Sequence, residues 1–223
     1  MNIGREKQRR SIWIFLAVSC VVIFSALAVN IHSTWINTFD QTLIGAIQGM
    51  ESPALTKFML FITWIGSTKQ VIVIAIITML ILYFVLKHRM ELWMLVITCA
   101  GSALLNIFLK TRFLRDRPTL HRLIEETGYS FPSGHSMAAF TLYCTIAFLI
   151  WKHMPNTASR VMTVLLSSFL IVAIGVSRIY LGVHFPSDVI GAYFISGCWV
   201  SLCIATYQYV LEYKLNPKPQ NAV

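Results

Sequence analysis

Three short segments of the chain carry residues that are equipped for chemistry. They are Lys110-Thr-Arg-Phe-Leu-Arg-Asp-Arg117-Pro118, Pro132-Ser133-Gly134-His135 and Ser177-Arg178-Ile-Tyr-Leu-Gly-Val-His184-Phe-Pro-Ser-Asp188. Together they hold cations, two histidines and one carboxylate, which are groups that bind and transfer a phosphate. Each segment lies at the end of a very apolar stretch. Because ionisable groups beside lipid are costly, such a cluster indicates a functional site.

The composition is that of a membrane protein. Of the 223 residues, 57% are hydrophobic and only 12% are charged, which leaves too little polar surface for an ordinary soluble domain. The formal net charge of +9 would also suit nucleic acid. The basic residues, however, lie between apolar stretches rather than along one solvated face. We therefore attribute the charge to membrane topology and phosphate binding.

Six apolar segments are long enough to cross a bilayer, which needs about 20 residues of helix. They lie near residues 12–30, 70–86, 91–109, 135–151, 161–177 and 188–210. The predicted fold class is all-α, a bundle of six transmembrane helices, with residues 1–223 forming one membrane domain. Residues 31–69, interrupted by Pro53, predict one or two further helices that lie in the outer membrane interface. Gly175, Gly191 and Gly197 are expected to allow close helix packing.

Basic residues predict the orientation of the bundle. Cations of the N-terminal segment and of alternate gaps fall on one side, which the positive-inside rule assigns to the cytoplasm. These cations are Arg5, Lys7, Arg9, Arg10, Lys87, Arg89, Lys152, Arg160, Lys214 and Lys218. Both termini are therefore expected in the cytoplasm. The opposite gaps also hold cations, but most of those belong to the three segments described above.

The six-span topology brings the chemical residues to one face of the membrane. Lys110 closes the third span, His135 opens the fourth, Arg178 closes the fifth and Asp188 opens the sixth. Each residue alone has an ordinary explanation, as a snorkelling cation, a filler residue at the interface or a residue in the first turn of a helix. Their joint spacing favours one composite site, which the orientation places on the extracytoplasmic side.

The three segments resemble the signature of the type 2 phosphatidic acid phosphatase superfamily, KxxxxxxRP, PSGH and SRxxxxxHxxxD, at every signature position. The six-span pattern extends the resemblance over the whole chain and is similar to that of the bacterial membrane lipid phosphatases, including phosphatidylglycerophosphatases. Soluble acid phosphatases and vanadium haloperoxidases share the motifs but lack the spans. The resemblance therefore implies a lipid phosphatase of the bacterial cell membrane.

The resemblance also implies roles for the catalytic residues. His184 would be the nucleophile that forms a phosphohistidine intermediate, and Asp188 would hold the far nitrogen of its ring. His135 would protonate the leaving group and then activate water.

The remaining signature residues would bind the substrate phosphate. Lys110, Arg117 and Arg178 would surround its equatorial oxygens. Ser133 and Gly134 would add donors at the start of a helix, a natural anion site. The sequence contains no HxxH or HExxH motif, and the three cations would take the place of magnesium. No metal or other cofactor is expected.

The expected function is hydrolysis of phosphatidylglycerophosphate to phosphatidylglycerol at the outer leaflet. The alternative substrate is undecaprenyl pyrophosphate, because the motif recognises only a terminal phosphate. A membrane protein that binds lipid phosphate without turnover is another alternative, although the residues that it would be expected to lose are present. A transporter is disfavoured, since the spans hold no ionisable residue near their centres. The expected partners are the lipid substrate and the bilayer, with no nucleic acid and no obligatory protein partner.

Overall fold

The structure, a computed structural model, describes residues 3–119, 121–151 and 153–215. Two of the cations used above to predict orientation, Lys152 and Lys218, lie outside the described residues. The regular structure of the described part is helical: α1 (Ile3–Val29), α2 (Thr34–Gln48), α3 (Pro53–Ile65), α4 (Thr68–Leu80), the π-helical turn η1 (Ile81–Val85), α5 (Arg89–Phe113), α6 (Gly134–Trp151), α7 (Thr157–Tyr180) and α8 (Pro186–Leu215). The predicted all-α fold class is confirmed.

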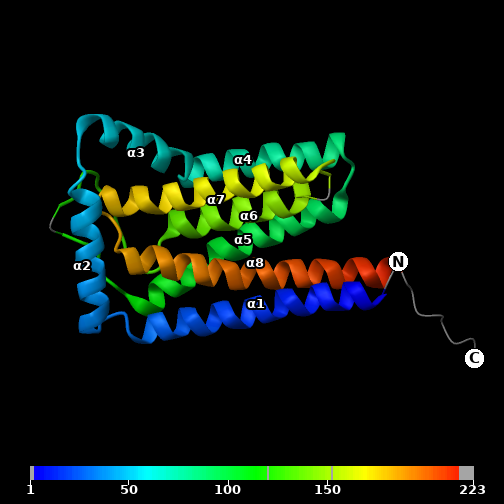
Figure 1. Ribbon diagram of the computed structural model, residues 1–223, viewed down its shortest axis with the longest axis horizontal. Coiled ribbons are helices and arrows are strands. Elements are labelled where there is room, and N and C mark those ends of the chain that lie inside the picture. The colour runs from blue at the N-terminus through cyan, green and yellow to red at the C-terminus, as the bar shows by residue number, and fades with distance from the viewer. Residues whose placement is uncertain (1–2, 120, 152, 216–223) are drawn as a thin grey trace, which may run out of the picture.

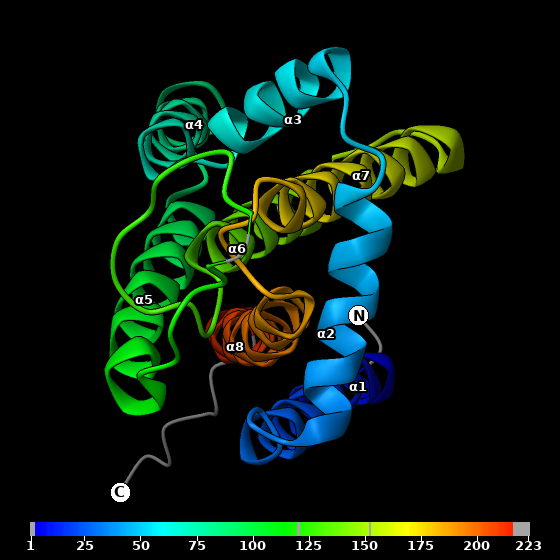
Figure 2. The same ribbon diagram turned by 90° about the vertical axis from the view of Figure 1, so that its left-hand side faces the viewer.

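Six of these helices are long and apolar enough to cross a membrane, and they match the six predicted spans. They run along one common direction, with α6 in the middle of the bundle and in contact with α4, α5, α7 and α8 (Figures 1 and 2). Helices α1 and α8 pack along much of their length. The chain forms a multi-pass membrane protein.

The outer surface of the bundle is apolar, as expected for helices that contact lipid. Large side chains such as Phe15, Leu104 and Phe169 are exposed. The helices differ in how deeply they are buried. Half of the residues in an apolar 18-residue stretch of α8 are buried, against 11% of those in the span formed by α4 and η1. Helix α8 is therefore a core helix, whereas α4 lies at the periphery.

Small residues allow the core helices to approach closely, as predicted. A Cβ atom on Gly175 would lie 1.9 Å from the Tyr193 hydroxyl, and one on Gly191 would lie 2.6 Å from the Phe131 ring. Both distances are shorter than any tolerable contact, so only glycine fits. At Gly197 the nearest atom is the Cys20 sulfur at 3.1 Å. These contacts fix the spacing of α8 against α7, α1 and the chain before α6.

The connection over residues 31–69 forms two helices, separated at the predicted break. The Ser52 hydroxyl caps α3 by accepting from the Leu55 N–H at 3.3 Å, and Pro53 occupies the first turn, where its missing N–H costs nothing. Helix α2 crosses the bundle over the adjoining ends of α7 and α8 (Figures 1 and 2). This helix pair therefore covers the bundle end at which the three chemical segments meet.

Candidate active site

Two connections carry Arg117, Ser133 and His184, and backbone contacts hold the connections together. Residues 114–133 join α5 to α6, and residues 181–185 join α7 to α8. The Leu123 N–H donates to the Leu181 carbonyl at 3.1 Å. Gly182 has a positive φ of 74°, and a Cβ there would lie 1.8 Å from the His121 carbonyl oxygen. Only glycine allows this approach.

His184 lies at the centre of the site. Its side chain is 1% exposed, its Nδ1 is 3.4 Å from Asp188 Oδ2, and its Nε2 is 3.1 Å from Arg117 Nη1. The backbone N–H of Phe185 also donates to Asp188 Oδ2 at 2.9 Å, which fixes the carboxylate. These contacts favour the tautomer with the proton on Nδ1. The lone pair of Nε2 is then directed to the Arg117 side of the ring.

Arg117 joins both connections to the imidazole. Its guanidinium donates to the carbonyl oxygens of Thr127 and Gly128 from the first connection, at 3.1 and 2.9 Å, and to that of Val183 from the second, at 2.9 Å. A planar guanidinium with five donors suits this role. The described residues provide no ion-pair partner for Arg117, so its positive charge stays available to an anion.

Arg115 forms a second buried network beneath Asp188. Its Nη1 donates to Asp188 Oδ1 at 2.7 Å, and its Nη2 donates to Asp40 Oδ2 at 2.9 Å. Ser187 donates to Asp40 through its backbone N–H at 2.8 Å and its hydroxyl at 2.6 Å. The Arg115 guanidinium also lies over the Phe185 ring, 4.1 Å from its centre. The network therefore connects α2, the first connection and the start of α8.

Sequence reasoning did not include Arg115 and Asp40 in the site. Arg115 lies inside the first signature segment, but it is not a signature position. Asp40 lies 70 residues or more from any signature residue, although one signal was present: it is the only charged residue of α2. Both side chains are buried, at 6% and 0% exposure. A lone carboxylate in an apolar helix was the sign that it needed a buried partner.

Arg178 is held by a carboxylate. Its Nη2 donates to Glu126 Oε1 at 2.5 Å, and its Nη1 donates to the Thr63 hydroxyl of α3 at 2.8 Å. Its Nε is buried and has no hydrogen-bond partner among the described residues. Glu126 was not included among the predicted site residues. Arg178 therefore keeps one donor that no described group occupies.

A cavity of about 600 Å³ opens beside these residues, between α4, α5 and α6. Its polar end is lined by Lys110, Arg117, Glu126, Gly134, His135 and His184. Its walls are apolar side chains of the spans, including Ile72, Ala75, Ile76, Met79 and Ile107. The cavity thus combines a cationic end with an apolar channel along the peripheral helix α4.

Three predicted residues do not line this cavity: Ser133, Arg178 and Asp188. Asp188 contacts His184, and Arg178 contacts Glu126; in each pair only the second residue lines the cavity. Ser133 is fully buried, and its hydroxyl accepts from the Ser136 hydroxyl at 2.9 Å and more weakly from the Ser136 N–H. This geometry gives no support to direct donation from Ser133 to a phosphate, because the hydroxyl is directed into the first turn of α6.

The charges of the site shift the pKa values of His184 and Glu126, which both lie outside the spans. Burial, and then the positive charges of Arg117, Arg178 and Lys110, lower the pKa of His184 well below 6.5. Burial favours the protonated form of Glu126. The charge and hydrogen bond of Arg178, with smaller contributions from His135 and Arg117, together outweigh burial and lower the pKa of that carboxyl. The site therefore holds a neutral His184 and an ionised Glu126 at neutral pH.

Comparison with known proteins agrees with this geometry. The sequence model of the PAP2 superfamily matches residues 91–212. Phosphatidylglycerophosphatase B of Bacillus subtilis (strain 168) is 34% identical over 177 residues, which cover 79% of this chain and 87% of that protein. A protein of Escherichia coli K12 that is provisionally named an undecaprenyl-diphosphatase is 39% identical over 88 residues, 35% of this chain and 38% of that protein.

A solved structure is also similar over nearly the whole chain. It is the transmembrane PAP2-type phosphatidylglycerolphosphate phosphatase from Bacillus subtilis, with a TM-score of 0.77 and 31% identity, covering 93% of this chain and all of that one. The chain belongs to the PAP2 superfamily. It is a membrane phosphatase that acts on lipid phosphates, a phosphoric monoester hydrolase.

The Arg115 network provides a test of how the site is held together. Arg115→Met leaves two buried carboxylates without their cation, and removing one member of a buried ion pair costs about 3–5 kcal/mol. We expect a clear fall in the melting temperature in detergent together with loss of turnover. Arg112→Met, which removes an exposed cation from the same stretch, is the control and should behave like the unchanged protein. Equal melting temperatures for both variants would contradict a supporting role for Arg115.

Proposed function

We propose that this enzyme removes the terminal phosphate of phosphatidylglycerophosphate through a phosphohistidine intermediate. One observation carries the proposal. His184 is neutral and contacts the Asp188 carboxylate, and it lines a cavity that has a cationic end and apolar walls. The 34% identity to phosphatidylglycerophosphatase B of Bacillus subtilis over most of both chains supports this choice of substrate.

In the first step, Nε2 of His184 attacks phosphorus in line with the leaving glycerol oxygen. Arg117 turns from the imidazole to the incoming phosphate, which frees the lone pair of Nε2. His135 donates a proton to the leaving alkoxide, so that phosphatidylglycerol departs as a neutral alcohol. Asp188 stabilises the positive charge that develops on the His184 ring. The step exchanges a P–O bond for a P–N bond.

In the second step, water attacks the phosphohistidine. His135, now neutral, accepts a proton from this water, and the P–N bond breaks to release inorganic phosphate and restore His184. Lys110, Arg117 and the free Nε donor of Arg178 stabilise the charge on the phosphoryl oxygens, with the backbone N–H of Gly134 as a further donor. Ser133 supports this set by capping α6. These side chains supply the positive charge, so turnover requires no metal ion.

The acyl chains of the substrate remain in the membrane during this reaction. The cavity walls are apolar along α4 and α5, and α4 is the least buried of the spans. A lipid therefore reaches the site sideways, and contacts with its chains help to orient the phosphate. Undecaprenyl pyrophosphate is the second candidate, favoured by the local 39% identity to the Escherichia coli protein.

The first test compares phosphate release from a panel of substrates by purified protein in micelles. We expect the highest kcat/KM for phosphatidylglycerophosphate and a value at least about tenfold lower for a short soluble phosphomonoester, because the latter lacks chain contacts. His184→Ala should lower turnover by more than about 1,000-fold, since it removes the covalent step. His121→Ala, at an exposed histidine near the same bundle end, should remain active.

Each contrary result has a definite meaning. Preference for undecaprenyl pyrophosphate would replace the proposed substrate. Near-normal turnover by His184→Ala would overturn its role as nucleophile. Binding of lipid phosphate without release of phosphate from any lipid would identify a non-catalytic binding protein.

The second test uses pH. Since burial and cations lower the pKa of His184, the imidazole stays neutral as pH falls through 6.5, and kcat/KM should decline only at lower pH. Arg117→Gln removes a positive charge beside the ring. The pKa of His184 should then rise and the acidic limb should move to higher pH, whatever the loss in rate. The substrate titrates identically with both proteins, so it cannot cause a difference between them. If the acidic limb of kcat/KM stays at the same pH in Arg117→Gln, a group other than His184 controls that limb.

The third test concerns orientation, which we propose to be cytoplasmic for both termini and extracytoplasmic for the site. The cations beside the other bundle end, among them Lys87, Arg89 and Arg160, support this orientation. In a cysteine-free chain, Thr127→Cys should react with an impermeant thiol reagent in intact cells. Ala158→Cys, exposed at the opposite end, should react only after lysis. The reverse pattern would invert the topology.

A further inference from the structure

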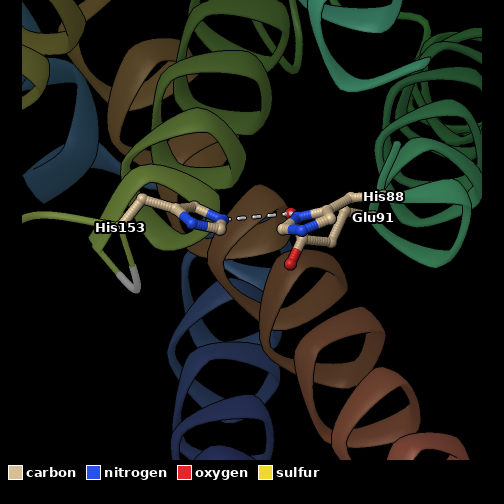
Figure 3. A group of neighbouring side chains, drawn as sticks. All are labelled: His88, Glu91 and His153. Atoms are coloured by element: carbon tan, nitrogen blue, oxygen red, sulfur yellow. Dashed lines mark hydrogen bonds and ion pairs between the residues drawn. The ribbon is translucent and has the colours of Figure 1, made fainter. Parts of the chain in front are cut away.

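A second cluster of ionisable side chains lies at the other end of the bundle, at the start of α5. It contains His88 and Glu91 from that start and His153 from the connection between α6 and α7 (Figure 3). Lys110 lies 22 residues further along α5 than His88, which is roughly 30 Å of helix. The cluster is therefore separate from the candidate active site, and neither the signature nor the proposed mechanism uses it.

The three side chains direct their ligating atoms at one another. Glu91 Oε2 is 3.1 Å from His88 Nδ1 and 3.5 Å from His153 Nε2. One ligating atom from each residue lies within 4.8 Å of the other two. Around a tetrahedral ion with bonds of about 2.0–2.1 Å, ligand atoms lie about 3.3 Å apart. Small side-chain rotations would bring all three atoms to that spacing.

The chemistry of these ligands selects the kind of ion. Two imidazole nitrogens and one carboxylate oxygen suit zinc and other late first-row metals, whereas calcium and magnesium prefer oxygen ligands. The neighbouring cations Lys87 and Arg89 disfavour an ion that is held by charge alone.

Glu91 is already oriented for this purpose. The residue is 5% exposed, and its other oxygen, Oε1, accepts a hydrogen bond from the Tyr207 hydroxyl at 3.4 Å. Such outer partners fix a ligating carboxylate in metal sites. His153 is exposed, so an ion can reach the cluster from the aqueous side.

We propose that His88, Glu91 and His153 bind one Zn²⁺ ion, with water in the fourth position. The ion fastens the start of α5 to the α6–α7 connection. It takes no part in hydrolysis, because the cationic end of the cavity lies at the other end of the spans.

The test measures zinc bound by untagged, purified protein after chelation and equilibrium dialysis. Because other imidazoles of the chain can also bind zinc, the informative quantity is the difference in zinc content between variants. We expect the unchanged protein and His121→Ala to bind one more zinc ion than His153→Ala. Tyr207→Phe should keep the site but weaken it about tenfold.

Two further readouts separate a metal site from a simple ion-pair cluster. Cobalt bound in place of zinc should give the visible absorption of a tetrahedral N/O site, and His153→Ala should lose this absorption. Zinc should raise the melting temperature of the unchanged protein but not that of His153→Ala, while chelation leaves turnover of both unchanged. Equal zinc content, cobalt spectra and melting temperatures in the two proteins would overturn the proposal and leave an ion-pair cluster.

Discussion

The buried bridge from Asp40 through Arg115 to Asp188 supports the candidate active site. Asp188 positions the His184 ring, and Arg115 positions Asp188 while it neutralises Asp40. In an apolar bundle an unpaired charge is costly, so each of these three bridging residues keeps the other two in place. The bridge also ties α2 across the ends of the spans. The helix that covers the bundle end and the imidazole in its centre therefore depend on the same guanidinium.

Charge balance explains how the site remains ready for an anion. Arg115 is offset by two carboxylates and Arg178 by Glu126, whereas Lys110 and Arg117 form no ion pair among the described residues. Two cations thus remain for a phosphate, beside the buried, unpartnered Nε of Arg178. Burial and the same positive charges keep His184 neutral. In the proposed mechanism this single arrangement serves phosphate binding and keeps the histidine ready to act as a nucleophile.

The most buried and the least buried spans contribute different groups to the structure. Helix α8, the most buried, carries Asp188 at its start and Tyr207 near its other end, so it contributes to both polar clusters. Helix α4, the least buried, contributes apolar wall to the cavity. The most buried helix therefore contributes to both polar clusters, and the least buried one forms the side of the cavity along which we propose that a lipid approaches.

The sequence by itself determined the six spans, the shared face of Lys110, His135, Arg178 and Asp188, and the membership of the superfamily. Hydropathy and the parity of helix ends are properties of order along the chain, and so they can be read without a structure. The catalytic and phosphate-binding roles assigned from the signature remain proposals.

Only the tertiary structure brought Asp40 to Arg115, Glu126 to Arg178 and His153 to Glu91. These pairs lie 75, 52 and 62 residues apart, and no periodicity relates their members. It also turned the Ser133 hydroxyl into the start of α6 rather than towards the cavity. The physical reason is that a buried charge needs a partner near in space, and the folded packing of the helices decides which residue that is.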